Sequence, residues 1–304
     1  ELCRRSTTSE DRIRRMLLAQ GITVDDTSVL PAFVADDAAT FELGASLFGE
    51  EATLAFTRVM GASVSAIVDA AIGLFYGEVS ATMPADTTEL EWARINAEAG
   101  AVFALLPSVI THLLEQRFRS ESVLAASTRD AVGQTATVGI GFVDLVGSTE
   151  WAAHLSLTDH ALALARFESA AWDIATEHHG RVVKLIGDEA MIVSASAETV
   201  CRIAVALCAA VASDPGLPGA RACVGFGDVT SRSGDFVGPL VNLVARSVKE
   251  ATEGSVVVTG DVRRQLGPHP PWPLVDTGSH TLRGIDAAVT LYAIDTGAGD
   301  DARR

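Results

Sequence analysis

The sequence predicts two domains of different class, an all-α domain over 1–132 and an α+β domain over 133–304 with a mainly antiparallel sheet. In the first part, apolar residues recur at helical spacing between capping residues and glycines. In the second part, short runs rich in valine and isoleucine alternate with longer helical patterns. A chain of 304 residues is long enough for each domain to bury a core of its own.

The N-terminal part reads as a series of helices. Ser9 is expected to cap the first helix, Gly61 to separate the third helix from the fourth, and Pro107 to kink a long helix that begins near Thr88. The first four helices are expected over 12–20, 36–47, 50–60 and 64–76.

No set of residues in this part suggests catalysis. Arg14 and Arg15 are interpreted as a solvated charged face. The helices carry more apolar surface than one small bundle needs, which favours a packing or regulatory role. The segment 117–132 combines mixed charge with small residues, so we expect it to connect the two domains.

The second part begins with a strand over 137–143 that ends on Asp144. The apolar runs on either side of Gly187-Asp188-Glu189 predict a β-hairpin with a carboxylate at its tip. The remaining helices are expected after Thr149 as far as His178-His179-Gly180, over 198–212 and from Gly238-Pro239. The remaining strands are expected over 220–229, 255–259, 273–275, 280–282 and 289–294, with a loop holding Arg232 and Asp235. This order indicates helices on one face of a mainly antiparallel sheet.

The hairpin places Asp188 beside the end of a neighbouring strand, and we expect that strand to be the one ending at Asp144. Two carboxylates at adjacent strand ends form a site for hard divalent cations, which prefer oxygen ligands. Gly147, Ser148 and Thr149 follow Asp144 and enter a helix, so their backbone N–H groups can bind an anion.

Three further polar residues are candidates for the site: Lys184, Asn242 and Arg246. Lys184 and Lys249 are the only lysines among 23 basic residues, and Lys184 lies inside the apolar hairpin. Taken alone, Lys184 is most simply a strand lysine that extends its ammonium to solvent. Asn242 and Arg246 are four residues apart on a predicted helix and therefore share a face.

Composition excludes several function classes. The net charge of −16 argues against binding to nucleic acid or to an anionic membrane surface. The four cysteines form no CxxC pair, which favours reduced thiols and a cytoplasmic protein. The most apolar windows, 101–114 and 203–212, are shorter than the roughly 20 residues of a membrane span, so we expect no span.

The motifs of the second part resemble one known family. They are Phe142-Val143-Asp144-Leu145-Val146-Gly147-Ser148-Thr149, Lys184-Leu185-Ile186-Gly187-Asp188, Asp235-Phe236-Val237-Gly238, Val241-Asn242-Leu243-Val244-Ala245-Arg246 and Leu282-Arg283-Gly284-Ile285-Asp286. In this order and spacing they resemble the catalytic domain of class III nucleotidyl cyclases over about 137–294. The resemblance implies a ferredoxin-like, palm-type fold.

The resemblance also implies roles for these residues. Asp144 and Asp188, with the carbonyl of Leu145, would hold two Mg²⁺ or Mn²⁺ ions. Asn242 would orient the ribose, and Arg246 would stabilise charge on the transferring phosphorus. The phosphates would be bound by Gly147, Ser148, Thr149 and Arg283.

Base choice would depend on Lys184 and Asp235. An ammonium can donate to adenine N1 and a carboxylate can accept from the N6 amino group, so the pair favours ATP over GTP. Guanylyl cyclases typically carry Glu and a small polar residue at these places. The family builds each site from residues of two catalytic domains, and this chain carries all six of them: Asp144, Lys184, Asp188, Asp235, Asn242 and Arg246. The resemblance therefore implies a homodimer that forms cyclic AMP.

Two other functions stay open at this point. The chain could be a catalytically silent nucleotide-binding module, or a relative of diguanylate cyclases and polymerase palms, to which Gly187-Asp188-Glu189 has a faint likeness. The N-terminal part resembles, more loosely, regulatory domains of bacterial cyclases in which autoinhibition responsive to pH or lipid is known. That likeness implies regulation of the catalytic domain.

Overall fold

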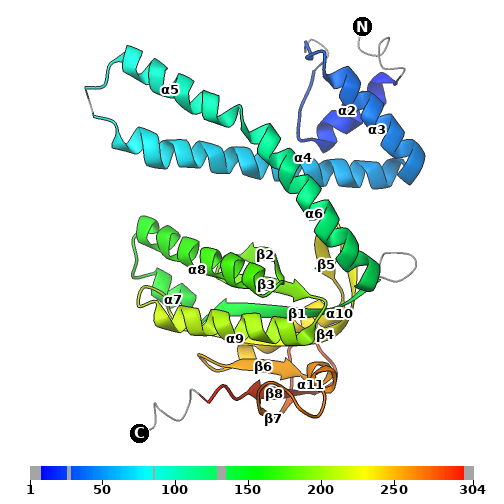
Figure 1. Cartoon of the computed structure of the whole chain (residues 1–304), viewed down its shortest axis with the longest axis vertical. Helices are drawn as coiled ribbons and strands as arrows, with labels where there is room; N and C mark the ends of the chain where they lie inside the picture. The colour runs from blue at the N-terminus through cyan, green and yellow to red at the C-terminus, as the bar shows by residue number, and fades with distance from the viewer. Residues whose placement is uncertain (1–7, 26–28, 85, 129–134, 298–304) are drawn as a thin grey trace. The chain divides into compact units, whose positions relative to one another are not determined.

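The computed structural model describes residues 8–25, 29–84, 86–128 and 135–297, with only the backbone for 120–128. The chain forms two compact units, Glu1–Phe118 and Arg119–Arg304 (Figure 1). The boundary predicted at 132 lies outside the described residues.

The first unit contains a small core formed by three helices, α2 (Glu10–Ala19), α3 (Val34–Phe48) and α4 (Glu50–Leu74). Ser9 caps α2 as expected, because its hydroxyl accepts a hydrogen bond from the Arg12 N–H at 3.4 Å. The buried core side chains are Ile13, Met16, Leu17, Ala19, Val34, Ala38, Phe41 and Leu54.

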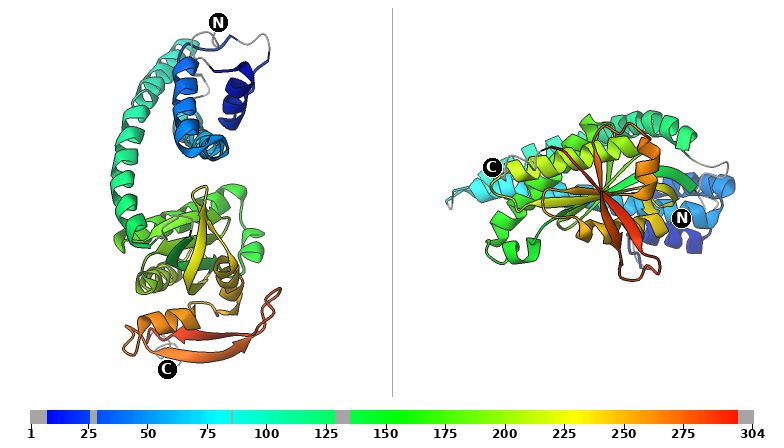
Figure 2. Two further views of the ribbon diagram at one scale, coloured as in Figure 1. Left: turned by 90° about the vertical axis from the view of Figure 1, so that its right-hand side faces the viewer. Right: turned by 90° about the horizontal axis from the view of Figure 1, so that it is seen from below.

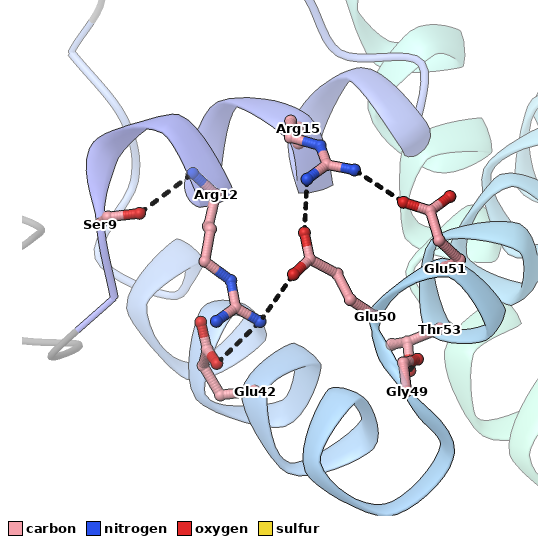
Figure 3. A network of polar contacts seen from close by, with 8 residues as sticks. All are labelled: Ser9, Arg12, Arg15, Glu42, Gly49, Glu50, Glu51 and Thr53. Atoms are coloured by element: carbon pink, nitrogen blue, oxygen red, sulfur yellow. Dashed lines mark hydrogen bonds and ion pairs between the residues drawn. The ribbon is translucent and has the colours of Figure 1, made fainter.

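Arginines of α2 join the three helices through ion pairs (Figure 3). Arg15 lies 2.5 Å from a carboxylate oxygen of Glu50 and 3.0 Å from one of Glu51, both in the first turn of α4. Arg12 bridges Glu42 at 3.2 Å and Glu50 at 3.6 Å. Arg15 is exposed, as expected of a solvated charged face, and it also forms these ion pairs.

The predicted break at Gly61 is wrong, because α4 runs through it without interruption. A Cβ atom at Gly61 would lie 2.7 Å from the carbonyl oxygen of Gln20. The missing side chain of Gly61 therefore lets the end of α2 pack closely against α4, and Gly61 does not form a turn. Beyond α4, the chain continues as a π-helical turn, η1 (Phe75–Val79), and a 3₁₀ turn, η2 (Ser80–Thr82).

Two further helices follow, α5 (Glu89–Phe103) and α6 (Leu106–Thr128). Thr88 and Glu91 form a capping box at the start of α5. Pro107 was expected to kink one long helix. Instead, α5 ends before Pro107, which lies in the first turn of the separate helix α6. Proline is tolerated there because the N–H groups of the first turn have no partner within the helix.

Two helical stretches of the first unit, Glu50–Thr82 and Glu89–Arg119, have the length and apolar composition of a membrane span. The prediction that the most apolar windows are too short for a membrane span is therefore wrong for these two stretches. The absence of a membrane span stays a prediction.

The described residues of the second unit form an eight-stranded sheet in the order β2-β3-β1-β4-β6-β8-β7, with β5 paired to β4. Neighbouring strands are antiparallel except β4 and β6, which are parallel. The strands are β1 (Thr135–Leu145), β2 (Arg181–Ile186), β3 (Glu189–Ser194), β4 (Ala220–Arg232), β5 (Asp235–Val237), β6 (Val256–Thr259), β7 (Leu274–His280) and β8 (Val289–Ile294).

Helices cover both faces of this sheet, not one face as expected (Figures 1 and 2). The central strand β1 has apolar residues on both sides, since Val143 and Leu145 belong to one core and Ile140 and Phe142 to the other. The first core is covered by α8 (Leu157–Glu177), α9 (Ala197–Ser213) and α11 (Gly260–Leu266), and the second by α10 (Pro239–Ser247) with η3 (Val248–Glu250).

Three local predictions differ from the structure. The expected loop at Arg232 and Asp235 is a hairpin, because Ser233 and Gly234 adopt positive φ angles of 53° and 81° that suit a tight turn. In place of the expected short strands 273–275 and 280–282 there is one strand, β7, which ends at His280 and has an irregularity between Asp276 and Ser279. The helix α11 was not predicted, since its seven residues are too few to show helical periodicity.

The cysteines agree with the prediction of buried thiols. Cys201, Cys208 and Cys223 are free and buried, and burial raises the thiol pKa of Cys201 and of Cys208 to about 12. Such thiols are unreactive at neutral pH. Cys3 lies outside the described residues.

Candidate active site

Asp144 and Asp188 lie at neighbouring strand ends, as predicted. β1 pairs with β3 so that Asp144 is opposite Glu189. The Leu145 N–H donates to the Asp188 carbonyl at 3.1 Å, which fixes the hairpin tip against the end of β1. Gly187 permits this turn because its φ angle is +64°.

The same strand end concentrates negative charge. The carboxyl pKa of Glu189 is raised to about 7, first by burial and then by the negative charges of Asp144 and Asp188. The nearby cations Lys249 and Arg221 lower this pKa and only partly offset the rise. A negative potential of this kind, with oxygen atoms as the available ligands, suits a divalent cation.

Arg221 contacts Asp144 directly and was missed in the sequence. Its Nε and Nη2 donate to one oxygen of Asp144, Oδ2, at 3.0 and 2.9 Å. Arg221 is opposite Asp144 in the β1–β4 ladder, a register that can be recognised only after the two strands have been paired. Among the described residues, no three His, Cys, Asp or Glu side chains are grouped as a metal site.

The phosphate-binding candidates follow Asp144 at the start of a short helix, α7 (Ser148–Ala152). Gly147 caps this helix in the left-handed conformation, with φ of +66°. The Val146 N–H donates to the Gly219 carbonyl at 2.7 Å, which anchors the turn to the sheet. Gly147 and Thr149 are exposed and Ser148 is half-buried, so a ligand can reach this turn.

Lys184 and Asp235, which are 51 residues apart, are brought into contact. The Lys184 ammonium lies 2.5 Å from Oδ2 of Asp235, and the two side chains are 35% and 36% exposed. The other Asp235 oxygen, Oδ1, accepts the Phe236 N–H at 2.7 Å. Lys184 therefore does not simply extend into solvent, and the pair presents a donor and an acceptor side by side.

Asn242 and Arg246 are exposed on α10 and line a cavity of about 630 Å³. Arg246 Nη1 donates to the carbonyl of Gly284 at 2.7 Å. Gly284 has a φ of +71° and follows Arg283, which is exposed. The other residues that line the cavity include Phe226, Leu240, Asp261 and Ile285.

The predicted site residues thus form three groups: Asp144 with Asp188, Lys184 with Asp235, and Asn242 with Arg246. Within the part of the chain that the structure describes, no hydrogen bond or ion pair joins the aspartates Asp144 and Asp188 to either of the other groups.

The sequence was also compared with known proteins. No family model matches it. An uncharacterised protein of Mycobacterium tuberculosis is 30% identical over 298 residues, which cover 94% of this chain and 76% of the relative. A pH-sensitive adenylate cyclase of the same species is 28% identical over 305 residues, which cover 94% of this chain and 75% of that protein. An adenylate cyclase of Glutamicibacter nicotianae is 36% identical over 160 residues, which cover 53% of this chain and 40% of that protein.

Solved cyclase structures resemble about half of the chain. An adenylate cyclase from Trypanosoma brucei covers 53% of this chain and 88% of its own length, with 21% identity and a TM-score of 0.49. The adenylyl cyclase CyaB from P. aeruginosa covers 53% of this chain and 94% of its own length, with 18% identity and a TM-score of 0.48. Two of these relatives match 94% of the chain, and one of the two is named an adenylate cyclase. The chain is thus a relative of adenylate cyclases, one of which it matches along 94% of its length.

Proposed function

We propose that the chain converts ATP to 3′,5′-cyclic AMP and pyrophosphate at sites shared by two copies of the chain. The contact between Lys184 and Asp235 carries the choice of substrate. An ammonium beside a carboxylate complements the acceptor N1 and the donor N6 of adenine, whereas guanine presents an acceptor and a donor in the opposite order. Relatives that are named adenylate cyclases support this reading.

Asp144 and Asp188, with the Leu145 carbonyl, would hold two Mg²⁺ or Mn²⁺ ions. Burial is the main cause of the raised Glu189 pKa, and the negative charges of Asp144 and Asp188, which raise it further, support a cation here. Mg²⁺ sites commonly use one or two protein carboxylates together with substrate phosphates, so two aspartates are sufficient. Bound ions would supply the Lewis acidity that promotes loss of the ribose 3′-hydroxyl proton and neutralises the triphosphate.

The remaining residues would bind and orient the nucleotide. Asn242 would hold the ribose, while Arg246 would exchange its bond to the Gly284 carbonyl for the charge developing at phosphorus. The amides at Gly147, Ser148 and Thr149 would donate to phosphate oxygens, and Arg283 lies next to Gly284, where it could assist.

A site shared by two copies fits the separation of these groups. The two aspartates would come from one copy, and Lys184, Asp235, Asn242 and Arg246 from the other. The absence of polar contacts between the two sets in the described part of one chain supports this arrangement. A homodimer would then carry two equivalent sites.

The helical unit would regulate the catalytic unit. A relative that matches along 94% of this chain is named a pH-sensitive adenylate cyclase, and α4 to α6 expose many apolar side chains that could pack in a second state. A chain shortened to begin at Thr135 is expected to have a different activity–pH profile from the full chain. Equal cyclic AMP production by the two chains at every pH would exclude this regulation.

The test of the proposed activity is product formation by the purified full chain with Mn²⁺ or Mg²⁺, with ATP and GTP assayed in parallel. Cyclic AMP from ATP alone, abolished in Asp188→Ala, is the expected result. The Asp188 side chain makes no hydrogen bond or ion pair within the described residues, so its loss should leave the fold intact. Nucleotide binding without turnover would instead support a silent nucleotide-binding module.

A further inference from the structure

Arg221 holds one of the two aspartates in a defined position. The antiparallel pairing of β1 with β4 places the two residues opposite each other, and both Nε and Nη2 donate to the same oxygen of Asp144. The third nitrogen, Nη1, donates to the carbonyl of Lys249 at 3.3 Å, so the guanidinium is fixed from two sides. The side chains of Arg221 and Asp144 are only 21% and 15% exposed, which limits screening by water.

Around this pair, three carboxylates are partly offset by two cations. Asp144, Asp188 and Glu189 supply carboxylates, while Arg221 and Lys249 are the cations that act on Glu189. Without Arg221, only Lys249 of these two cations would offset the carboxylates. A carboxylate that lacks a nearby partner attracts a divalent cation more strongly, and it also destabilises the folded chain when no cation is bound.

We infer that Arg221 is a positioning residue that competes with divalent cations for Asp144: it partners the carboxylate in the metal-free chain and weakens cation binding. This inference rests on the proposed function, which assigns Asp144 to the metal ions. An oxygen that accepts two charge-assisted hydrogen bonds has less electron density to offer a cation, so a cation that binds Oδ2 of Asp144 must displace or weaken the Arg221 contacts.

Mn²⁺ binding to the full chain without nucleotide tests the inference, with free Mn²⁺ measured by electron paramagnetic resonance. Arg221→Gln is expected to bind Mn²⁺ about tenfold more tightly than the wild type. Its metal-free Tm should fall, and saturating Mn²⁺ should raise the Tm by more than it does in the wild type. A purely structural role for Arg221 would weaken binding or leave it unchanged.

Arg202→Gln is the matched control, since Arg202 pairs with Glu198 at 2.6 Å on the exposed side of α9 and its removal changes the net charge equally. It should bind Mn²⁺ like the wild type. If Arg221→Gln does not fold, Arg221→Lys keeps the charge but cannot make both contacts, and it should bind Mn²⁺ more tightly than the wild type by a smaller factor.

The outcomes separate the inference from the proposed function. Binding that is lost in Asp144→Asn, yet is no tighter in the Arg221 variants than in the wild type, overturns the inference and leaves the metal site in place. Binding that is the same in wild type and Asp144→Asn overturns the assignment of Asp144 to the metals, and the inference with it.

Discussion

Gly284 shows how a single residue without a side chain can position a catalytic candidate. Its carbonyl accepts the hydrogen bond from Arg246, and its left-handed backbone, with φ of +71°, aims that carbonyl. A Cβ atom added at Gly284 would lie 2.9 Å from Arg246 Nη1. Space for the arginine therefore depends on a glycine at this position.

Gly284→Ala is expected to lower kcat for cyclic AMP formation by about tenfold or more, because small displacements of a catalytic group are costly. The KM for ATP should change less. Gly278→Ala is the matched control, since Gly278 also has a positive φ, of +90°, but its added Cβ would meet nothing within 4 Å. The two variants share the backbone strain, of about 1 kcal/mol, and differ only at Arg246. Equal kcat values for both would contradict this role of Gly284.

Among the elements, α4 shows that one residue type can have opposite effects along one helix. Gly61 faces the backbone of Gln20, whereas Gly73 is exposed and a Cβ atom there would meet nothing within 4 Å. The first glycine permits the packing of α2 on α4. The second only weakens the helix, because glycine loses more backbone entropy than alanine.

Gly61→Ala should therefore destabilise the helical unit, by about 1–3 kcal/mol, as overpacking generally does. Gly73→Ala should stabilise it, by about 0.5–1 kcal/mol. Differential scanning calorimetry of the full chain measures both effects as shifts of the transition in opposite directions. A Gly61→Ala chain as stable as Gly73→Ala would show that α2 does not pack against Gly61.

At the scale of the whole molecule, the two sets of catalytic candidates belong to different parts of one chain. Asp144 lies at the end of β1, while Arg246 lies on α10, and within the described residues no hydrogen bond or ion pair joins their side chains. Pairing between two copies is the arrangement we propose to complete each site.

Mixing Asp144→Ala chains with Arg246→Ala chains should restore activity. Each heterodimer keeps one site with all its residues and loses the other, so random pairing is expected to give about a quarter of the wild-type rate. Each variant alone should be inactive. Cyclic AMP production by the mixture that stays at the level of the separate variants would argue against shared sites.

The sequence alone determined the class of each half and most of its elements. Periodicity and caps identified α2, and the Gly-Asp-Glu turn identified the β2–β3 hairpin, because these signals depend on neighbours in the chain. The same local signals predicted that Asp188 lies beside the strand ending at Asp144, which the strand pairing confirms. The roles of these residues in catalysis stay predictions.

Only the tertiary structure decided contacts between residues distant in the chain. Gly61 has the same local signal as a helix-breaking glycine, and the approach of Gln20 explains why the helix continues. Arg221 became a partner of Asp144 only through the β1–β4 register, and Gly284 became a partner of Arg246 only through the packing of α10. Such contacts depend on register and packing, which are set by the whole core rather than by any one segment.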